Sequence, residues 1–190
     1  MQYRSRLACT VENTLTQRPI VTKKMYVNSD GETEYQPSEC HALNEITVTR
    51  GDSEFMCRFD IYVNDVFWTV VQGDGVMMST PTGSTAYNLS CGGPIAHPMA
   101  EIVCLTPICA HSLAFRPVIL PASAKITIRL PEGARSHAMV SFDGQLKFKM
   151  ERNEQIVIQQ SAYCVPFVHW SEQNQDSVWV NKLDKTLQWN

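Results

Sequence analysis

The sequence lacks the features of a membrane-spanning or secreted protein. No apolar run approaches the roughly 18 residues that a membrane span needs. The first residues, MQYRSRLACTVEN, contain no apolar stretch of the kind that a signal peptide carries. The net charge is only −3 at pH 7, so neither nucleic acid nor a membrane surface is an expected partner. With 190 residues, 44% of them hydrophobic, the chain can bury a sizeable core, and we expect a globular domain.

The cysteines form no C-x-x-C pair and no Cys/His cluster with the spacing of a zinc site. Several stand inside apolar runs such as FMCRF and IVCLT, where a thiol behaves as a small hydrophobic side chain. We therefore expect unpaired, mostly buried thiols in a reducing compartment. The seven residues are Cys9, Cys40, Cys57, Cys91, Cys104, Cys109 and Cys164.

Short β-branched and apolar runs dominate the chain, and turn residues separate them. This spacing is typical of an antiparallel β sandwich or a barrel-like domain. The segment MVSFDGQLKFKM predicts a hairpin around Asp143 and Gly144. The polar segment from Tyr26 to Ala42 is predicted to be a loop. The fold class is therefore mainly β.

Two segments depart from the β pattern. Residues Ser84 to Ser90 begin with hydroxyl residues and are followed by two glycines, which are start and stop signals of a short helix. The tail SEQNQDSVWVNKLDKTLQWN predicts a second helix, because its apolar residues share one face. These are Val178, Leu183 and Leu187, with Trp179 and Trp189 nearby.

The stretch at residues 71–94, VQGDGVMMSTPTGSTAYNLSCGGP, is rich in glycine but matches no common phosphate loop. It has no lysine, which excludes a Walker A loop. The spacing of Gly73, Gly75 and Gly83 does not fit a dinucleotide-binding G-x-G-x-x-G. A G-x-S-x-G turn, which would present a nucleophilic serine, is missing as well.

Local chemistry leaves two interpretations of this stretch. In the first, it binds a polar ligand, because Thr82, Ser84 and Thr85 stand at a helix mouth with unpaired N–H groups. Asp74, between two glycines, would approach the ligand closely. In the second, the stretch is only a capped helix after a tight turn.

The sequences of several segments resemble motifs of the NAD kinase family, and most closely those of its eukaryotic members. The likeness covers nearly the whole chain in the same order and includes an Asn-Glu motif. The matching segments are LNEITVTRG (43–51), GDGVMMSTPTGSTAYNLSCGGPIAHP (73–98), LTPICAHSLAFRPVILP (105–121) and VSFDGQ (140–145).

The resemblance implies two domains, of which this chain is the second. Residues 1–165 would form the all-β NAD-binding domain, and residues 166–190 a tail that packs on an N-terminal α/β domain. The family's GGDGT motif, whose aspartate acts on the ribose hydroxyl, does not occur in this sequence. We therefore expect no catalytic residue and no metal ligand in this chain, and an inactive protein when it is isolated.

The family transfers phosphate from ATP, with a divalent metal such as Mg²⁺, to the 2′-hydroxyl of the adenosine ribose of NAD, giving NADP. Asn44 and Glu45 would contact the adenosine, and Asp74 the nicotinamide end. His97 and His111 are assigned no catalytic role. The residues expected to bind NAD are Asn44, Glu45, Asp74, Thr82, Thr85, Ala86, Tyr87, Asn88, Ser90 and Gln145.

The resemblance also implies a homo-oligomer, either a dimer or a tetramer, in the cytoplasm or in an organelle. Two alternatives are a non-catalytic nucleotide-binding or assembly module and a related lipid kinase domain. The missing GGDGT motif keeps the first alternative open for the chain as it stands, whereas the Asn44-Glu45 pair and the TGSTAY segment argue against the second.

Overall fold

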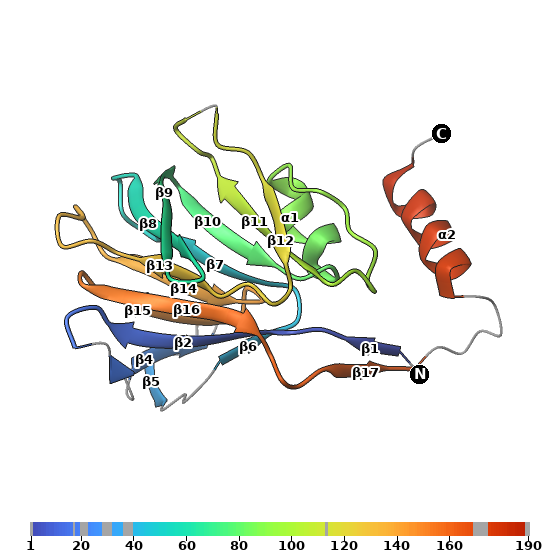
Figure 1. The fold of residues 1–190 in the computed structure, drawn as a ribbon, viewed down its shortest axis with the longest axis horizontal. Coiled ribbons are helices and arrows are strands. Elements are labelled where there is room, and N and C mark those ends of the chain that lie inside the picture. The colour runs from blue at the N-terminus through green and yellow to red at the C-terminus, as the bar shows by residue number, and fades with distance from the viewer. Residues whose placement is uncertain are drawn as a thin grey trace.

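The computed structural model describes residues 2–16, 18–19, 23–27, 32–35, 40–112, 114–168 and 175–188. Most of these residues lie in strands, and every strand pairing among them is antiparallel (Figure 1). This confirms the prediction of a mainly β, antiparallel fold. In the described part of the chain, no helix is both long and apolar enough to cross a membrane.

The strands form two large sheets and one small ribbon. In spatial order, the eight-stranded sheet contains β12 (Val118–Pro121), β11 (Ile102–Ile108), β10 (Gly75–Ser79), β7 (Glu45–Thr49), β14 (Ala138–Phe142), β15 (Leu146–Met150), β4 (Lys23–Val27) and β5 (Glu32–Tyr35). The seven-stranded sheet contains β3 (Arg18–Pro19), β2 (Leu7–Asn13), β16 (Glu154–Gln160), β13 (Ile126–Arg129), β8 (Cys57–Val63) and β9 (Val66–Gly73), with β6 (Cys40–Ala42) paired to β2. The ribbon pairs β1 (Gln2–Arg4) with β17 (Val165–Phe167).

One hydrophobic core lies between the two large sheets. Alternate residues of strands such as β7 point into it, as the period of two requires, so that Ile46 and Val48 of β7 lie with Ile128 and Ile156 of the other sheet in one buried cluster. The residues between them face outward. On the eight-stranded sheet this outer face carries buried polar side chains, among them Glu45, Thr47, Ser79, Thr106 and Ser141. Polar groups buried on a sheet face need partners, and this face holds the candidate site.

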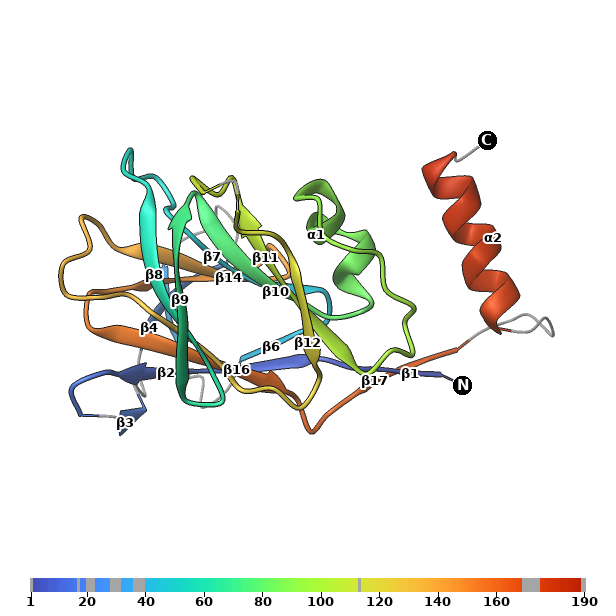
Figure 2. The same ribbon diagram turned by 45° about the horizontal axis from the view of Figure 1, so that its top comes forward.

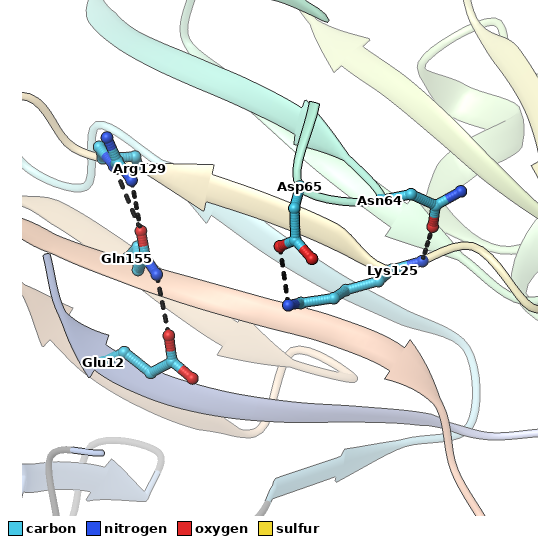
Figure 3. Close-up of polar contacts among 6 residues, drawn as sticks. All are labelled: Glu12, Asn64, Asp65, Lys125, Arg129 and Gln155. Carbon is cyan, nitrogen blue, oxygen red and sulfur yellow. Dashed lines mark hydrogen bonds and ion pairs between the residues drawn. The ribbon is translucent and has the colours of Figure 1, made fainter. Parts of the chain in front are cut away.

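The outer face of the seven-stranded sheet is polar and internally paired (Figure 3). Gln155 accepts hydrogen bonds from Arg129 at 3.1 and 3.2 Å and donates one to Glu12 at 2.8 Å, which links three neighbouring strands. The turn between β8 and β9 is tied to β13, because Lys125 Nζ lies 2.8 Å from Asp65 Oδ1. These contacts fix the register of the strands, and the polar side chains involved bond to one another.

The hairpin prediction is confirmed. Phe142 of β14 pairs with Leu146 of β15, and the turn between them contains Asp143 and Gly144 with φ of 48° and 71°. Two successive positive φ values are what a type I′ turn needs, and Asp and Gly tolerate them well. Four of the seven cysteines, Cys9, Cys40, Cys57 and Cys104, are buried, as the apolar runs around several of them predicted, whereas Cys109 and Cys164 are exposed.

One local prediction was wrong, and a second was correct only in part. The segment predicted as a loop contains strands β5 and β6, and its first residues belong to β4. Strand β5 pairs with its neighbour β4, and β6 pairs with β2, so strand pairing overrides the polar composition of the segment. The predicted helix at 84–90 consists of two short pieces, a 3₁₀ turn (Gly83–Thr85) and α1 (Tyr87–Ser90), separated at Ala86 with φ of −97° and ψ of −131°. Neither piece has a side-chain cap at its start.

The predicted C-terminal helix is present as α2 (Gln175–Leu187), beside the end of the domain that carries α1 and the β1–β17 ribbon (Figures 1 and 2). The predicted domain boundary after residue 165 falls inside β17, which pairs with β1. Trp189 lies outside the described residues.

Candidate functional site

Three segments that are far apart in the sequence meet where three adjacent central strands of the eight-stranded sheet begin or end: β7 begins there, and β10 and β14 end there. They are the turn at residues 43–45, the segment 80–90 and the hairpin at 143–145. Thr80 joins the first two, because its N–H donates to Asn44 O at 2.9 Å and its hydroxyl donates to Leu43 O at 2.6 Å. The same hydroxyl accepts from Gly83 N–H at 3.1 Å. The TPTG segment is thereby fixed against the Asn-Glu turn.

Gly83 allows this close approach. A Cβ atom added there would lie 2.1 Å from Asn44 O and 2.5 Å from its carbonyl carbon. No side chain fits at such a distance from backbone, so glycine is required for contact rather than for an unusual φ. The segment TGSTAY was part of the family resemblance, and this contact explains why its second residue is glycine.

Asp143 holds the Asn-Glu turn from the other side. Its carboxylate accepts N–H bonds from Leu43 at 2.8 Å, Asn44 at 2.8 Å and Glu45 at 3.1 Å. Its own N–H donates to Glu45 O at 3.0 Å. Hydrogen bonds to an ionised carboxylate are stronger than neutral ones, so the backbone that presents Asn44 and Glu45 is held rigidly. The sequence placed Asp143 only in a turn, and this second role was missed.

Two buried oxygens at this junction have no hydrogen-bond partner among the described residues. They are Oε2 of Glu45 and Oγ1 of Thr82. Burial, and then the negative charge of Asp143, raise the pKa of Glu45 from 4.5 to about 7. Because an unsatisfied buried polar atom is unfavourable, both atoms indicate a place where a polar ligand completes the structure.

Asn88 is placed differently from its neighbours. Its side chain is completely buried, and its Nδ2 donates to Ser84 O at 3.2 Å and to Pro94 O at 3.0 Å. Its Oδ1 accepts the hydroxyl of Thr106 at 2.6 Å. The amide therefore anchors the 80–90 segment on β11 and does not face solvent in this conformation.

The remaining residues of this segment are accessible. Thr85, Tyr87 and Ser90 are exposed, Ala86 is half-buried, and Gln145 is exposed in the neighbouring hairpin. Burial is the main cause of a raised pKa at Tyr87, with contributions from Cys91 and from the charge of Asp74. The segment thus presents a row of hydroxyl groups beside the unpartnered oxygens.

Asp74 immediately precedes β10, at the end of this strand that lies away from the junction. At about 3.4 Å per residue, it is roughly 17 Å from residue 79. Its carboxylate pairs with Arg50 Nε at 2.8 Å. The flanking glycines have a different purpose from the one predicted. A Cβ at Gly73 would lie 2.8 Å from Cys109 O, and one at Gly75 would lie 2.5 Å from Val48 O, so both serve close backbone packing.

Comparison with known proteins identifies the family. The family model described as the ATP-NAD kinase C-terminal domain matches residues 43–170 of this chain. The chain belongs to this family.

Named relatives agree with this membership. The chain is similar to the chloroplastic NAD kinase 2 of Arabidopsis thaliana, with 46% identity over 148 residues, which cover 78% of this chain and 15% of that protein. It is similar to the NAD(+) kinase of Saccharomyces cerevisiae, with 39% identity over 150 residues, 79% of this chain and 28% of that protein. The crystal structure of yeast NADH kinase complexed with NADH matches all of this chain and 49% of that chain, with a TM-score of 0.78 and 29% identity. The chain therefore spans less than half the length of these proteins.

In this NAD kinase family domain, a groove of about 350 Å³ opens beside the junction. We call it the α2 groove, because α2 forms one wall and residues 81–98 form the other. It is lined by Gln2, Arg4, Pro81, Thr82, Thr85, Leu89, His97, Pro98, Phe167, Val178, Trp179, Lys182, Leu183, Thr186 and Leu187. Two of the predicted NAD-binding residues, Thr82 and Thr85, thus lie across the groove from the tail.

Two backbone N–H groups at the predicted start of the helix already have hydrogen-bond acceptors in this domain. The N–H of Gly83 bonds to Thr80 Oγ1, and the N–H of Ser84 bonds to Pro81 O. The ligand-facing chemistry comes from side chains instead. Among the described residues, no three His, Cys, Asp or Glu side chains converge as a metal site would require. The ring of His97 packs edge-on against Trp179 at 4.8 Å, and His111 is exposed.

Proposed function

We propose that this chain is the NAD-binding part of a NAD kinase, which transfers the γ-phosphoryl group of ATP to the 2′-hydroxyl of the adenosine ribose of NAD. The products are NADP and ADP. The observation that carries this proposal is the pair of unpartnered buried oxygens, on Glu45 and Thr82, where the two motif segments meet. Family membership and the names of the relatives support it.

The site chemistry suits the adenosine end of NAD. The Asn44 amide can pair with the adenine edge, and Glu45, when ionised, can accept from a ribose hydroxyl. Thr82 and Thr85 stand on the adenine side, and the Tyr87 ring, with Ala86 and Ser90, offers a wall that is accessible to the ligand. Gln145 and Asp74 would complete the site toward the nicotinamide. Asn88 acts through the position of this segment rather than by contact.

The reaction itself needs a part of the protein beyond this domain. In the transfer, the 2′-oxygen forms a bond to the γ-phosphorus while the bond from that phosphorus to the β–γ bridging oxygen breaks. The proton of the hydroxyl leaves to a base, which by resemblance is the aspartate of a GGDGT motif. Phosphoryl transfer depends mainly on positioning and charge stabilisation. This domain supplies the positioning of the acceptor.

Mg²⁺ would accompany the ATP phosphates. This metal commonly binds through one or two carboxylates together with substrate phosphates. The described residues provide no cluster of three acidic or imidazole ligands.

The tail and the ribbon indicate where that α/β domain would attach. Strands β1 and β17 lie side by side, so the chain enters and leaves the β domain at one place (Figure 1). Helix α2 follows β17 and stands beside the sheets rather than within them (Figure 2). We infer that residues 166–190 pack on the N-terminal domain and that this domain faces the junction.

We further propose a homo-oligomer. The edge strands β9 and β12 carry exposed apolar side chains, among them Trp68 of β9, whose ring lies 6.4 Å from that of the half-buried Phe115 before β12. Val66 and Ile119, on the same two strands, are exposed as well. An apolar area on two sheet edges favours association with a second copy.

The compartment follows from the thiols and the relatives. Cysteines that serve mostly as buried apolar side chains suit a reducing compartment. Relatives are named as chloroplastic and mitochondrial, so we propose the cytoplasm or an organelle as the location.

The test restores an N-terminal α/β domain with its GGDGT motif and measures NADP formation from NAD and ATP. We expect activity with NAD and none with diacylglycerol. Asn44→Ala should raise KM for NAD at least tenfold, whereas Asn181→Ala, on the exposed side of α2, should leave it unchanged. NAD binding without turnover in the restored protein would support a non-catalytic module instead. Unaltered kinetics in the Asn44 variant would remove that residue from the site.

A further inference from the structure

Arg50 and Asp74 form an ion pair at the end of β10 that lies away from the junction. Nε of Arg50 lies 2.8 Å from Oδ1 of Asp74, and the two side chains are 37% and 40% exposed. Ion pairs with this much exposure contribute little to stability, because water screens them. The contacts around the pair nevertheless fix both partners closely, which indicates a purpose other than folding.

The backbone of Asp74 is held from two sides. Its N–H donates to Ile108 O at 3.0 Å, and its carbonyl accepts from the N–H of Arg50 at 2.9 Å. Gly73 and Gly75, on either side of it, pack so tightly against other strands that neither leaves room for a Cβ. Only the side-chain torsions of Asp74 therefore remain to be set, and a short exposed carboxylate has several rotamers to choose from.

Arg50 sets those torsions, because its own guanidinium is fixed. Its Nη1 donates to the carbonyl of Ser53, and the N–H of Ser53 donates back to Arg50 O at 3.1 Å, which closes the turn after β7. Gly51, with φ of 60°, lets the chain make this turn. The planar guanidinium thus bonds in one direction to its own turn and in another to Asp74.

The pairing leaves one carboxylate oxygen of Asp74 available. Only Oδ1 bonds to Arg50, and Oδ2 has no hydrogen-bond partner among the described residues. The pKa of Tyr87 is raised mainly by burial and then by Cys91, and the negative charge of Asp74 adds to the effect. Because charge effects decline with distance, the carboxylate lies near the accessible 80–90 segment rather than away from it.

We propose that Arg50 is a positioning residue for the dinucleotide: it orients Asp74 so that Oδ2 accepts a hydrogen bond from the carboxamide N–H of the nicotinamide. An acceptor that is already oriented loses less side-chain freedom when the ligand binds, so affinity rises without a contact from Arg50 itself. The inference rests on the proposed function, which assigns Asp74 to the nicotinamide end.

Two ligands separate this role from a general effect on the site. ADP-ribose keeps the adenosine and the pyrophosphate of NAD but lacks the nicotinamide. We would titrate the 190-residue chain with each ligand in a calorimeter, at an ionic strength held constant with KCl. Arg50→Met should weaken NAD binding at least fivefold and change ADP-ribose binding by less than twofold. Arg58→Met is the matched control, because it removes an equal charge from an exposed position on β8, and it should leave both affinities within twofold.

A second set of variants tests whether Arg50 acts through Asp74. Asp74→Asn should weaken NAD binding about as much as Arg50→Met does, and the double variant should bind no more weakly than Asp74→Asn alone. Losses that add up in the double variant would mean that Arg50 acts independently, which would overturn the proposal.

Arg50→Lys distinguishes orientation from charge and also covers the case in which Arg50→Met unfolds. Lysine keeps the positive charge but has no planar fork to bond in two fixed directions. We expect NAD binding at least threefold weaker than in the wild type, at an unchanged melting temperature. Affinity within twofold of the wild type would show that only the charge matters and would refute positioning.

The wild-type titrations keep this inference apart from the proposed function. Tighter binding of NAD than of ADP-ribose, with the difference reduced in Arg50→Met, supports both. The same difference preserved in Arg50→Met refutes the role of Arg50 alone. Equal affinities for the two ligands would remove the nicotinamide contact but leave the adenosine site standing. Binding of neither ligand would count against the proposed function as well.

Discussion

Replacing Gly83 by alanine should separate the two motif segments of the site. The added Cβ would lie 2.1, 2.5 and 2.7 Å from the O, C and Cα atoms of Asn44, whereas ordinary contacts begin at 3.4 Å. The segments must therefore move apart by about 1 Å, and the two hydrogen bonds from Thr80 to Leu43 O and Asn44 O must lengthen. At about 1 kcal/mol for each hydrogen bond, and about 1–3 kcal/mol for overpacking, we expect a loss of ~3–5 kcal/mol in unfolding free energy.

Gly133→Ala is the control, because a Cβ there meets nothing within 4 Å and its φ is not in the left-handed region. Urea unfolding of both variants measures the difference. The control should change stability by less than about 1 kcal/mol, and a gain is possible from reduced chain entropy. A Gly83 variant within 0.5 kcal/mol of the control, roughly the usual effect of a surface substitution, would refute the contact argument. NAD affinity should fall in the Gly83 variant only.

Three further predictions concern the same junction. Glu45→Gln should abolish a pH dependence of stability. The folded pKa of Glu45, about 7, exceeds the unfolded value of 4.5, so the unfolding free energy of the wild type falls by up to ~3 kcal/mol as pH rises through this window. Urea unfolding at pH 4.5 and at pH 8 should show this fall only in the wild type. Asp143→Asn should lower the pKa of Glu45 and raise KM for NAD severalfold, with kcat less affected; a carboxyl NMR titration that leaves the Glu45 pKa unmoved would argue against the charge effect. Asn88→Ala should cost about 2–4 kcal/mol, because it leaves the Thr106 hydroxyl and two buried carbonyls without their partner, and a melting temperature equal to that of the wild type would contradict the anchoring role.

Most strands could be predicted from the sequence where alternation and turn residues coincide. The hairpin around Asp143 and the buried runs of β7, β10 and β11 are of this kind. Strand β2 was not predicted, although Leu7, Cys9 and Val11 alternate as a half-buried strand requires. The ribbon of β1 and β17 gives no local signal, because each strand has three residues and the partners are 161 to 165 positions apart.

The residues of the site were predicted from sequence motifs, but the contacts that hold those residues in place were not. The motifs indicated Asn44, Glu45 and the TGSTAY segment. The role of Asp143 depends on partners 98 to 100 residues away, and the burial of Asn88 depends on Thr106 in another strand. Periodicity and propensity describe neighbours along the chain, so contacts of this range escape them.

The bonds from Asp143 to the Asn-Glu turn also bear on how the domain folds. Each closes a loop of about a hundred residues, and contacts of such sequence separation form slowly, because the chain entropy is lost before the bond is gained. During synthesis, the turn emerges long before its carboxylate partner exists. Ligand recognition would therefore appear late in refolding, together with the pairing of β7 and β14, which closes a loop of similar length, and a nucleotide would rescue late intermediates rather than guide early ones.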